Sequence, residues 1–80
     1  MERIEIEEKV KSILIDDMEV DEDKIYNDAS LKDDMGIDSL DYVDIVVIVD
    51  KIFGFKIKPE EMTNVKTFMD FCSYIEQKIA

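Results

Sequence analysis

Hydrophobic residues recur at helical spacing in three segments of the chain, and each segment predicts a helix. In the first segment the apolar positions fall three and four residues apart, with charged and polar side chains between them. These positions are Ile6, Val10, Ile13 and Leu14. The pattern therefore predicts a first helix from Glu2 to about Asp16.

The segment from Asp17 to Ile37 shows no sustained periodicity and is predicted to be a long loop. It is acidic, and its apolar residues stand alone, at Met18, Val20, Ile25, Leu31 and Met35. A loop of this length is unusual in a compact domain and is often functional. The isolated apolar residues predict that the loop is anchored to the core.

The segment from Asp38 to Phe53 is rich in β-branched residues, which favour strands, yet its ends favour a helix. Asp38 and Asp41 have the spacing of a capping box, and Gly54 stands where a helix would end. The apolar residues follow at spacings of three and four, at Tyr42, Ile45, Val46, Val49 and Phe53. We therefore expect a helix that buries these side chains.

Two further caps mark the last elements. Pro59 suits the first position of a short helical turn, "PEEM", whose two glutamates suit the positive end of a helix. Thr67 and Asp70 form another cap pair, and an apolar face then runs to about Lys78. The pattern thus predicts one all-α domain over residues 1–80, a four-helix bundle with three longer helices, one short helix and a long loop between the first two.

The charge of the chain limits its partners. It holds 21 acidic and 10 basic residues, a net charge of -11, which argues against nucleic acid and against an anionic membrane surface. The longest apolar run, Ile45 to Val49, is too short to span a bilayer, so no membrane insertion is expected. A single cysteine and a charged N-terminal segment favour a cytoplasmic location. Partners with basic surfaces fit best.

Histidine is absent, which excludes Ser-His-Asp and Cys-His catalysis and imidazole ligands. One cysteine makes a structural zinc site implausible, and no window of the acidic loop matches a calcium-binding EF-hand. We therefore expect neither a catalytic residue nor a specific metal site.

Ser39 lies in the first turn of the predicted second helix, where backbone N–H groups are free and the helix dipole is positive. A phosphate attached to its hydroxyl would be well placed there, and Gly36 would allow a tight turn that leaves the serine outward. The same residue also fits as an ordinary small residue of a first turn. The pattern alone leaves both interpretations open.

The stretch "DASLKDDMGIDSLDYVDIVVIVDKIFGFKI" resembles the acyl carrier protein family. "VKSIL", "IKPEE" and "TFMDFCSYI" follow in the family's order and at its distances, so the resemblance covers nearly the whole chain. It implies that Ser39 carries 4′-phosphopantetheine, added from coenzyme A by a phosphopantetheinyl transferase. The arm then holds acyl groups as thioesters for the acyl-transferring and chain-elongating enzymes of fatty-acid or related biosynthesis. A carrier of this kind needs no catalytic residue of its own.

The second helix also exposes a face on which acidic and apolar side chains alternate. Leu40, Asp44, Val47 and Lys51 lie opposite the predicted core face, with Asp41 at its edge and Asp38 before it. Scattered surface hydrophobics would explain these apolar residues. The resemblance instead implies a docking surface made of Asp38, Leu40, Asp41, Asp44 and Val47.

Two features bear on how closely the chain follows the family. Lys51 stands where the family usually has an acid, which puts docking to a standard fatty-acid synthesis set in doubt. An acyl chain folded into the interior would meet a set of apolar residues that ordinary packing explains equally well. The set is Met35, Val46, Val49, Ile57, Met62, Phe68, Phe71 and Ile75.

Alternatives to this prediction are an aminoacyl, D-alanyl or polyketide carrier, and, from a different class, an acidic helical adaptor that is never modified. We expect the carrier protein to be a monomer.

Overall fold

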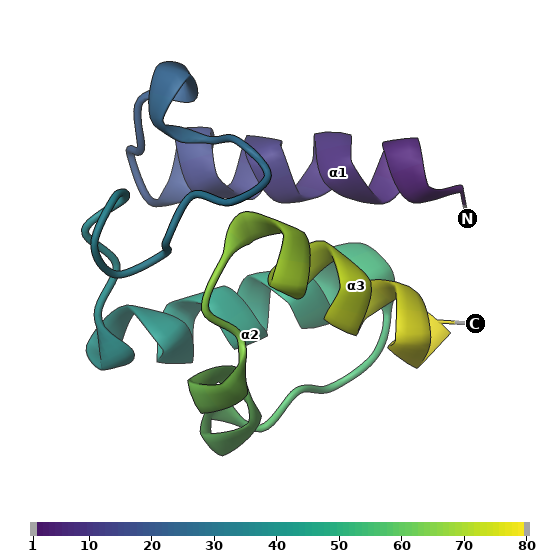
Figure 1. Cartoon of the computed structure of the whole chain (residues 1–80). Coiled ribbons are helices and arrows are strands. Elements are labelled where there is room, and N and C mark those ends of the chain that lie inside the picture. The colour runs from purple at the N-terminus through teal and green to yellow at the C-terminus, as the bar shows by residue number, and fades with distance from the viewer. Residues whose placement is uncertain (1, 80) are drawn as a thin grey trace.

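The computed structural model describes residues 2–79 and shows three main helices packed around a common core (Figure 1). They are α1 (Arg3–Ser12), α2 (Ser39–Phe53) and α3 (Phe68–Ile79). Three short helical elements accompany them: η1 (Ile13–Asp17), η2 (Glu22–Lys24) and η3 (Pro59–Asn64). No strand occurs within residues 2–79, and none of their helices is long and apolar enough to cross a membrane. The predicted all-α bundle is confirmed.

The first helix differs from its prediction at its end. α1 ends at Ser12, and the chain continues as a π-helical turn, η1. In this turn Met18 N donates to Ile13 O at 3.2 Å. The chain therefore stays helical to Asp17, one residue beyond the prediction. Ile13 and Leu14, adjacent in this stretch, are both buried.

Local caps set both limits of α2 and the start of α3, as predicted. Asp38 caps α2, and Gly54 ends it in the left-handed region at a φ of 79°. Before α3, Thr67 N donates to Asp70 Oδ2 at 3.3 Å and Asp70 N donates to Thr67 Oγ1 at 3.1 Å. α3 ends at Ile79, close to the predicted end.

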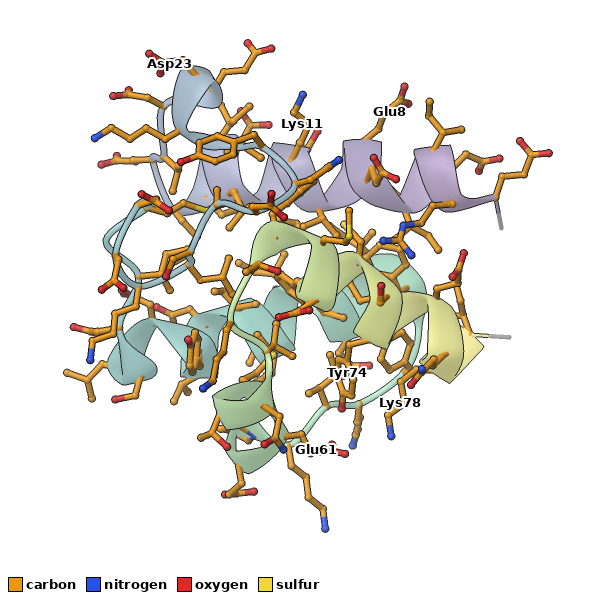
Figure 2. The ribbon with its side chains drawn as sticks, in the orientation of Figure 1. Glu8, Lys11, Asp23, Glu61, Tyr74 and Lys78 are labelled. Carbon is orange, nitrogen blue, oxygen red and sulfur yellow. The ribbon has the colours of Figure 1, made fainter. Side chains whose placement is uncertain are left out.

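The predicted short helix is present as η3, and contacts from α3 hold it in place. Glu61 Oε2 accepts a hydrogen bond from Lys58 N at 3.2 Å, while Glu61 Oε1 lies 3.5 Å from Lys78 Nζ. The same ammonium lies 5.5 Å from the ring centroid of Tyr74, and Figure 2 shows these three side chains together. η3 is therefore joined to α3 at the surface as well as through the core.

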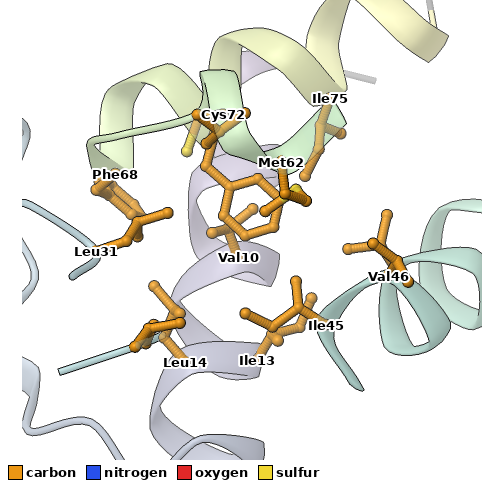
Figure 3. Close-up of a cluster of buried hydrophobic side chains, with 14 of the residues drawn as sticks. Val10, Ile13, Leu14, Leu31, Ile45, Val46, Met62, Phe68, Cys72 and Ile75 are labelled. Carbon is orange, nitrogen blue, oxygen red and sulfur yellow. The ribbon is translucent and has the colours of Figure 1, made fainter. Parts of the chain in front are cut away.

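One continuous hydrophobic core joins the helices (Figure 3). Ile45, Val46 and Val49 of α2 are buried in it, as predicted. Tyr42 and Phe53 were expected on the same face but are only partly buried. They occupy the first and last turns of α2, where the neighbouring segments do not cover them fully, so the core face of this helix is shorter than its periodicity suggests.

The long loop is anchored, as predicted. Val20, Ile25 and Leu31 are buried, and Met18 and Met35 pack against the core from partly buried positions. Backbone hydrogen bonds also attach the loop to the start of α3: Leu31 N donates to Lys66 O at 2.9 Å and Phe68 N to Ala29 O at 3.0 Å. These bonds fix the end of the loop that leads into α2.

Candidate functional site

Ser39 is the first residue of α2, and it is exposed. Its neighbours Asp38 and Leu40 are exposed as well, while Ile37 just before them is buried. Ile37 N also donates to Leu31 O at 2.8 Å, which fixes the chain where it enters the helix. The buried isoleucine thus holds the turn, and Ser39 lies exposed beside it.

Gly36 makes this entry possible through its backbone conformation. Its φ is 73°, in the left-handed region that glycine adopts without a steric penalty. A Cβ placed on Gly36 would meet no atom within 4 Å, so space is not the reason for a glycine. The expected turn before the serine is confirmed. It favours glycine because of its backbone conformation and not because of a lack of space.

The first turn of α2 is less open to a phosphate than its sequence suggests. Asp38 Oδ1 accepts hydrogen bonds from Leu40 N at 2.9 Å and from Asp41 N at 3.3 Å. The expectation that these N–H groups are free is therefore wrong, because the cap residue already uses them. A phosphate on Ser39 would also lie between two carboxylates, so repulsion would direct it outward. An exposed residue at the start of the helix fits such an attached group.

The predicted docking face is exposed along α2. Leu40 is 79% exposed and Val47 is 51% exposed, and Asp44 and Lys51 are exposed too. Asp41 is partly buried because it takes part in the cap. The sequence interpretation missed Val43, which is 50% exposed. Its spacing from Leu40 and Val47, three and four residues, was a signal for the same stripe.

The loop adds acids to this face that no local pattern revealed. A groove of about 420 Å³ lies between the end of η1 and α2. Asp17 and Glu19 line it from one side, and Asp41 and Asp44 from the other. Met18, Val47 and Ile48 supply apolar contact area in the same groove. The acidic surface beside Ser39 is therefore wider than one helix.

The single cysteine of the chain is poorly placed to react as a nucleophile. Cys72 is buried in α3, and burial raises the pKa of its thiol to about 12. A thiol in this state is rarely ionised and reacts slowly. Of the residues expected to line the interior, Met35 is partly buried and the others are buried in the same core.

Comparison with known proteins agrees with this geometry. The family model described as "Phosphopantetheine attachment site" matches residues 8–75. The chain is 43% identical over 77 residues to an acyl carrier protein of Thermotoga maritima, covering 96% of this chain and 95% of that protein. It is 39% identical over 80 residues to one of Thermosynechococcus vestitus (100% and 99% covered) and 41% identical over 73 residues to one of Bdellovibrio bacteriovorus (91% and 94%).

Proposed function

Because the chain belongs to the acyl carrier protein family, whose members carry 4′-phosphopantetheine, we propose that Ser39 is the residue to which the arm is attached. The observation that supports this most directly is the position of an exposed hydroxyl at the first residue of α2. The other hydroxyls of serine fit less well. Ser30 Oγ accepts a hydrogen bond from Asp33 N at 3.1 Å, Ser73 is partly buried, and Ser12 lies at the negative end of α1.

The arm supplies a thiol that holds acyl groups as thioesters, so the chain itself needs only to present it. Ser39 supplies the oxygen that receives phosphopantetheine from coenzyme A when a phosphopantetheinyl transferase acts. Ile37 and the cap of α2 hold that oxygen at a fixed point of the surface. The acids of the first turn keep the attached phosphate outward. Each of these contributions is positional, as expected for a carrier rather than an enzyme.

We further propose that partner enzymes dock on α2 beside Ser39. The docking surface comprises Asp38, Leu40, Asp41, Val43, Asp44 and Val47, with Asp17 and Glu19 at its edge. Opposite charges accelerate encounter and set orientation, and the apolar side chains provide the desolvated contact. The transferase and the acyl-transferring and chain-elongating enzymes would share this surface.

The pathway we favour is fatty-acid or related acyl-chain biosynthesis, with the protein acting as a single monomeric domain. Lys51 provides one reason to keep a dedicated pathway as the second candidate. It is exposed in the last turn of the docking helix and breaks the run of acids there. A partner with a carboxylate at the matching position would recognise this carrier and reject more acidic ones.

Intact-mass measurement tests the attachment directly. The protein is incubated with coenzyme A and a broad-specificity phosphopantetheinyl transferase, and we expect a single added arm. Ser39→Ala should fold and remain unmodified, while Ser30→Ala and Ser73→Ala should accept the arm. An arm on Ser39→Ala would overturn the assignment, and no addition to the parent would favour an unmodified adaptor.

A further inference from the structure

A pocket of about 330 Å³ opens one turn along α2 from Ser39. Tyr42 forms one wall, Ser30, Lys32 and Asp33 come from the loop, and Thr63 and Lys66 come from η3 and the link to α3. Ligand pockets range upward from roughly 300 Å³, so this one suits a group of a few heavy atoms. Its walls combine polar and apolar surface in nearly equal shares, and Val65 supplies part of the apolar surface.

Two lysines meet in this pocket, although the chain as a whole carries a net charge of -11. Neither belongs to the ion pairs found among residues 2–79, which are formed by Arg3 and Lys78. Asp33 is the one acid among the lining residues, so the two ammonium groups outnumber it. Asp34, which accepts from Ser30 N at 2.7 Å, and Asp38, whose charge acts on Tyr42, are further carboxylates next to the pocket. The two lysines are therefore the groups through which the pocket itself can attract an anion.

A neutral donor completes the site. The hydroxyls of Ser30 and Thr63 are already engaged, because Ser30 Oγ accepts from Asp33 N at 3.1 Å and Thr63 Oγ1 donates to Glu60 O at 2.8 Å, whereas Tyr42 lines the pocket with a phenol hydroxyl. Burial raises the pKa of Tyr42, and the negative charge of Asp38 raises it further. The phenol therefore keeps its proton at neutral pH and can donate a hydrogen bond to an oxygen anion.

Resting on the proposed attachment at Ser39, we infer that this pocket binds the terminal carboxylate of a short dicarboxylic acyl group carried on the arm. The arm's own phosphate is a poor occupant, because it is bonded directly to Ser39 and Ser39 does not line the pocket. The far end of the arm can fold back by one helical turn, a short distance for a flexible chain. A carboxylate placed there would meet Lys32 and Lys66.

Matched cargoes test this inference. Succinyl and butyryl groups have the same number of carbons, and only succinyl ends in a carboxylate. Each is loaded with its arm from the corresponding coenzyme A thioester, and intact mass confirms loading before any other measurement. The same loading is tried on Ser39→Ala, and an arm on that variant would refute the attachment at Ser39, whereas the binding experiments below refute only the pocket.

NMR spectroscopy then measures the response of the pocket residues and that of the succinyl carboxyl group. We expect succinyl to shift the backbone amides of Tyr42, Thr63 and Lys66 more than butyryl does. With a ¹³C-labelled terminal carboxyl, the succinyl pKa should be lower by roughly one unit than in the double variant Lys32→Gln/Lys66→Gln, because nearby cations favour the carboxylate. Added salt should reduce the difference.

A second double variant, Lys24→Gln/Lys56→Gln, controls for net charge, since both of these lysines are exposed and do not line the pocket. It should retain the amide shifts and the low carboxyl pKa. Equal amide shifts from succinyl and butyryl, or an equal rise of the carboxyl pKa in both double variants, would overturn the inference.

Discussion

Asp38 and Asp41 exchange hydrogen bonds across the first turn of α2. Asp38 Oδ1 accepts from Asp41 N at 3.3 Å, and Asp41 Oδ2 accepts from Asp38 N at 3.1 Å. The pair is a capping box in which aspartate replaces the usual glutamate or glutamine. Ser39 lies between the two, so the same contacts that begin the helix also fix the backbone of the proposed attachment residue.

Replacing the cap residue should weaken the fold. Asp38→Ala removes the acceptor for two backbone N–H groups and should lower the free energy of unfolding by about 1 kcal/mol. Urea denaturation followed by circular dichroism measures this change. Asp38→Asn keeps a capping oxygen and should cost less. Asp44→Ala, an exposed acid further along α2, is the matched control, and an equal loss there would show that the cap is unimportant.

The contacts of Glu61 should make stability depend on pH. The backbone N–H of Lys58, followed by Tyr74 and Lys78, holds the pKa of this carboxyl below its usual 4.5. A lowered folded-state pKa stabilises the protein above the unfolded value, and that contribution is lost as pH falls through the folded value. Glu61→Gln should therefore be less stable than the parent at pH 7, and the two should converge in acid.

Thermal melting from pH 7 down to pH 3 checks this expectation. Glu60→Gln changes the same charge on the neighbouring exposed residue and should track the parent across the range. A constant gap between Glu61→Gln and the parent at every pH would show that the carboxylate charge has no part in holding η3.

The two thiols of the arm-bearing protein should differ sharply in reactivity. With a pKa of about 12, Cys72 is ionised to only roughly one part in ten thousand at pH 8, and it is also buried. A thiol reagent should titrate one group in the native protein and two after denaturation. Cys72→Ala should show one group in both states. Rapid reaction of Cys72 in the native, arm-free protein would contradict this.

Charge and apolar contact on α2 should affect docking in different ways. Asp44→Lys should slow association with the transferase, and the defect should shrink as salt rises. Val47→Ala should mainly speed dissociation, by about fivefold, because it removes apolar contact worth about 1 kcal/mol. Surface plasmon resonance at several salt concentrations separates the two rates.

Two further variants sharpen the docking experiment. Glu8→Lys makes the same charge reversal on an exposed residue of α1, away from α2 (Figure 2), and should leave both rates nearly unchanged. Lys51→Glu should improve recognition by a general fatty-acid synthesis enzyme and impair a partner that uses the lysine. Parent-like kinetics in all of the α2 variants would exclude this helix as the docking surface.

The ends of α2 and the start of α3 could be predicted from the sequence because they depend on local bonds. The proposed role of Ser39 came instead from the family resemblance of the surrounding stretch, since the local pattern left two interpretations open. The cap of α2 at Asp38 joins groups no more than three residues apart, and the left-handed stop at Gly54 is a property of one residue. The same holds for the pair Thr67 and Asp70. Short-range hydrogen bonds of this kind leave a readable pattern, and α2 is helical despite the strand preference of its β-branched residues.

Contacts between distant segments were decided only by the tertiary structure. How far the ends of α2 are covered depends on where the loop and η3 pack, so Tyr42 is partly buried despite its place on the core face. The groove that joins Glu19 to Asp44, and the pocket that joins Lys32 to Lys66, each bring together residues far apart in the chain. Periodicity specifies which side of a helix is buried, but packing determines which neighbouring segment covers it. The same packing determines which charged side chains line the groove and the pocket.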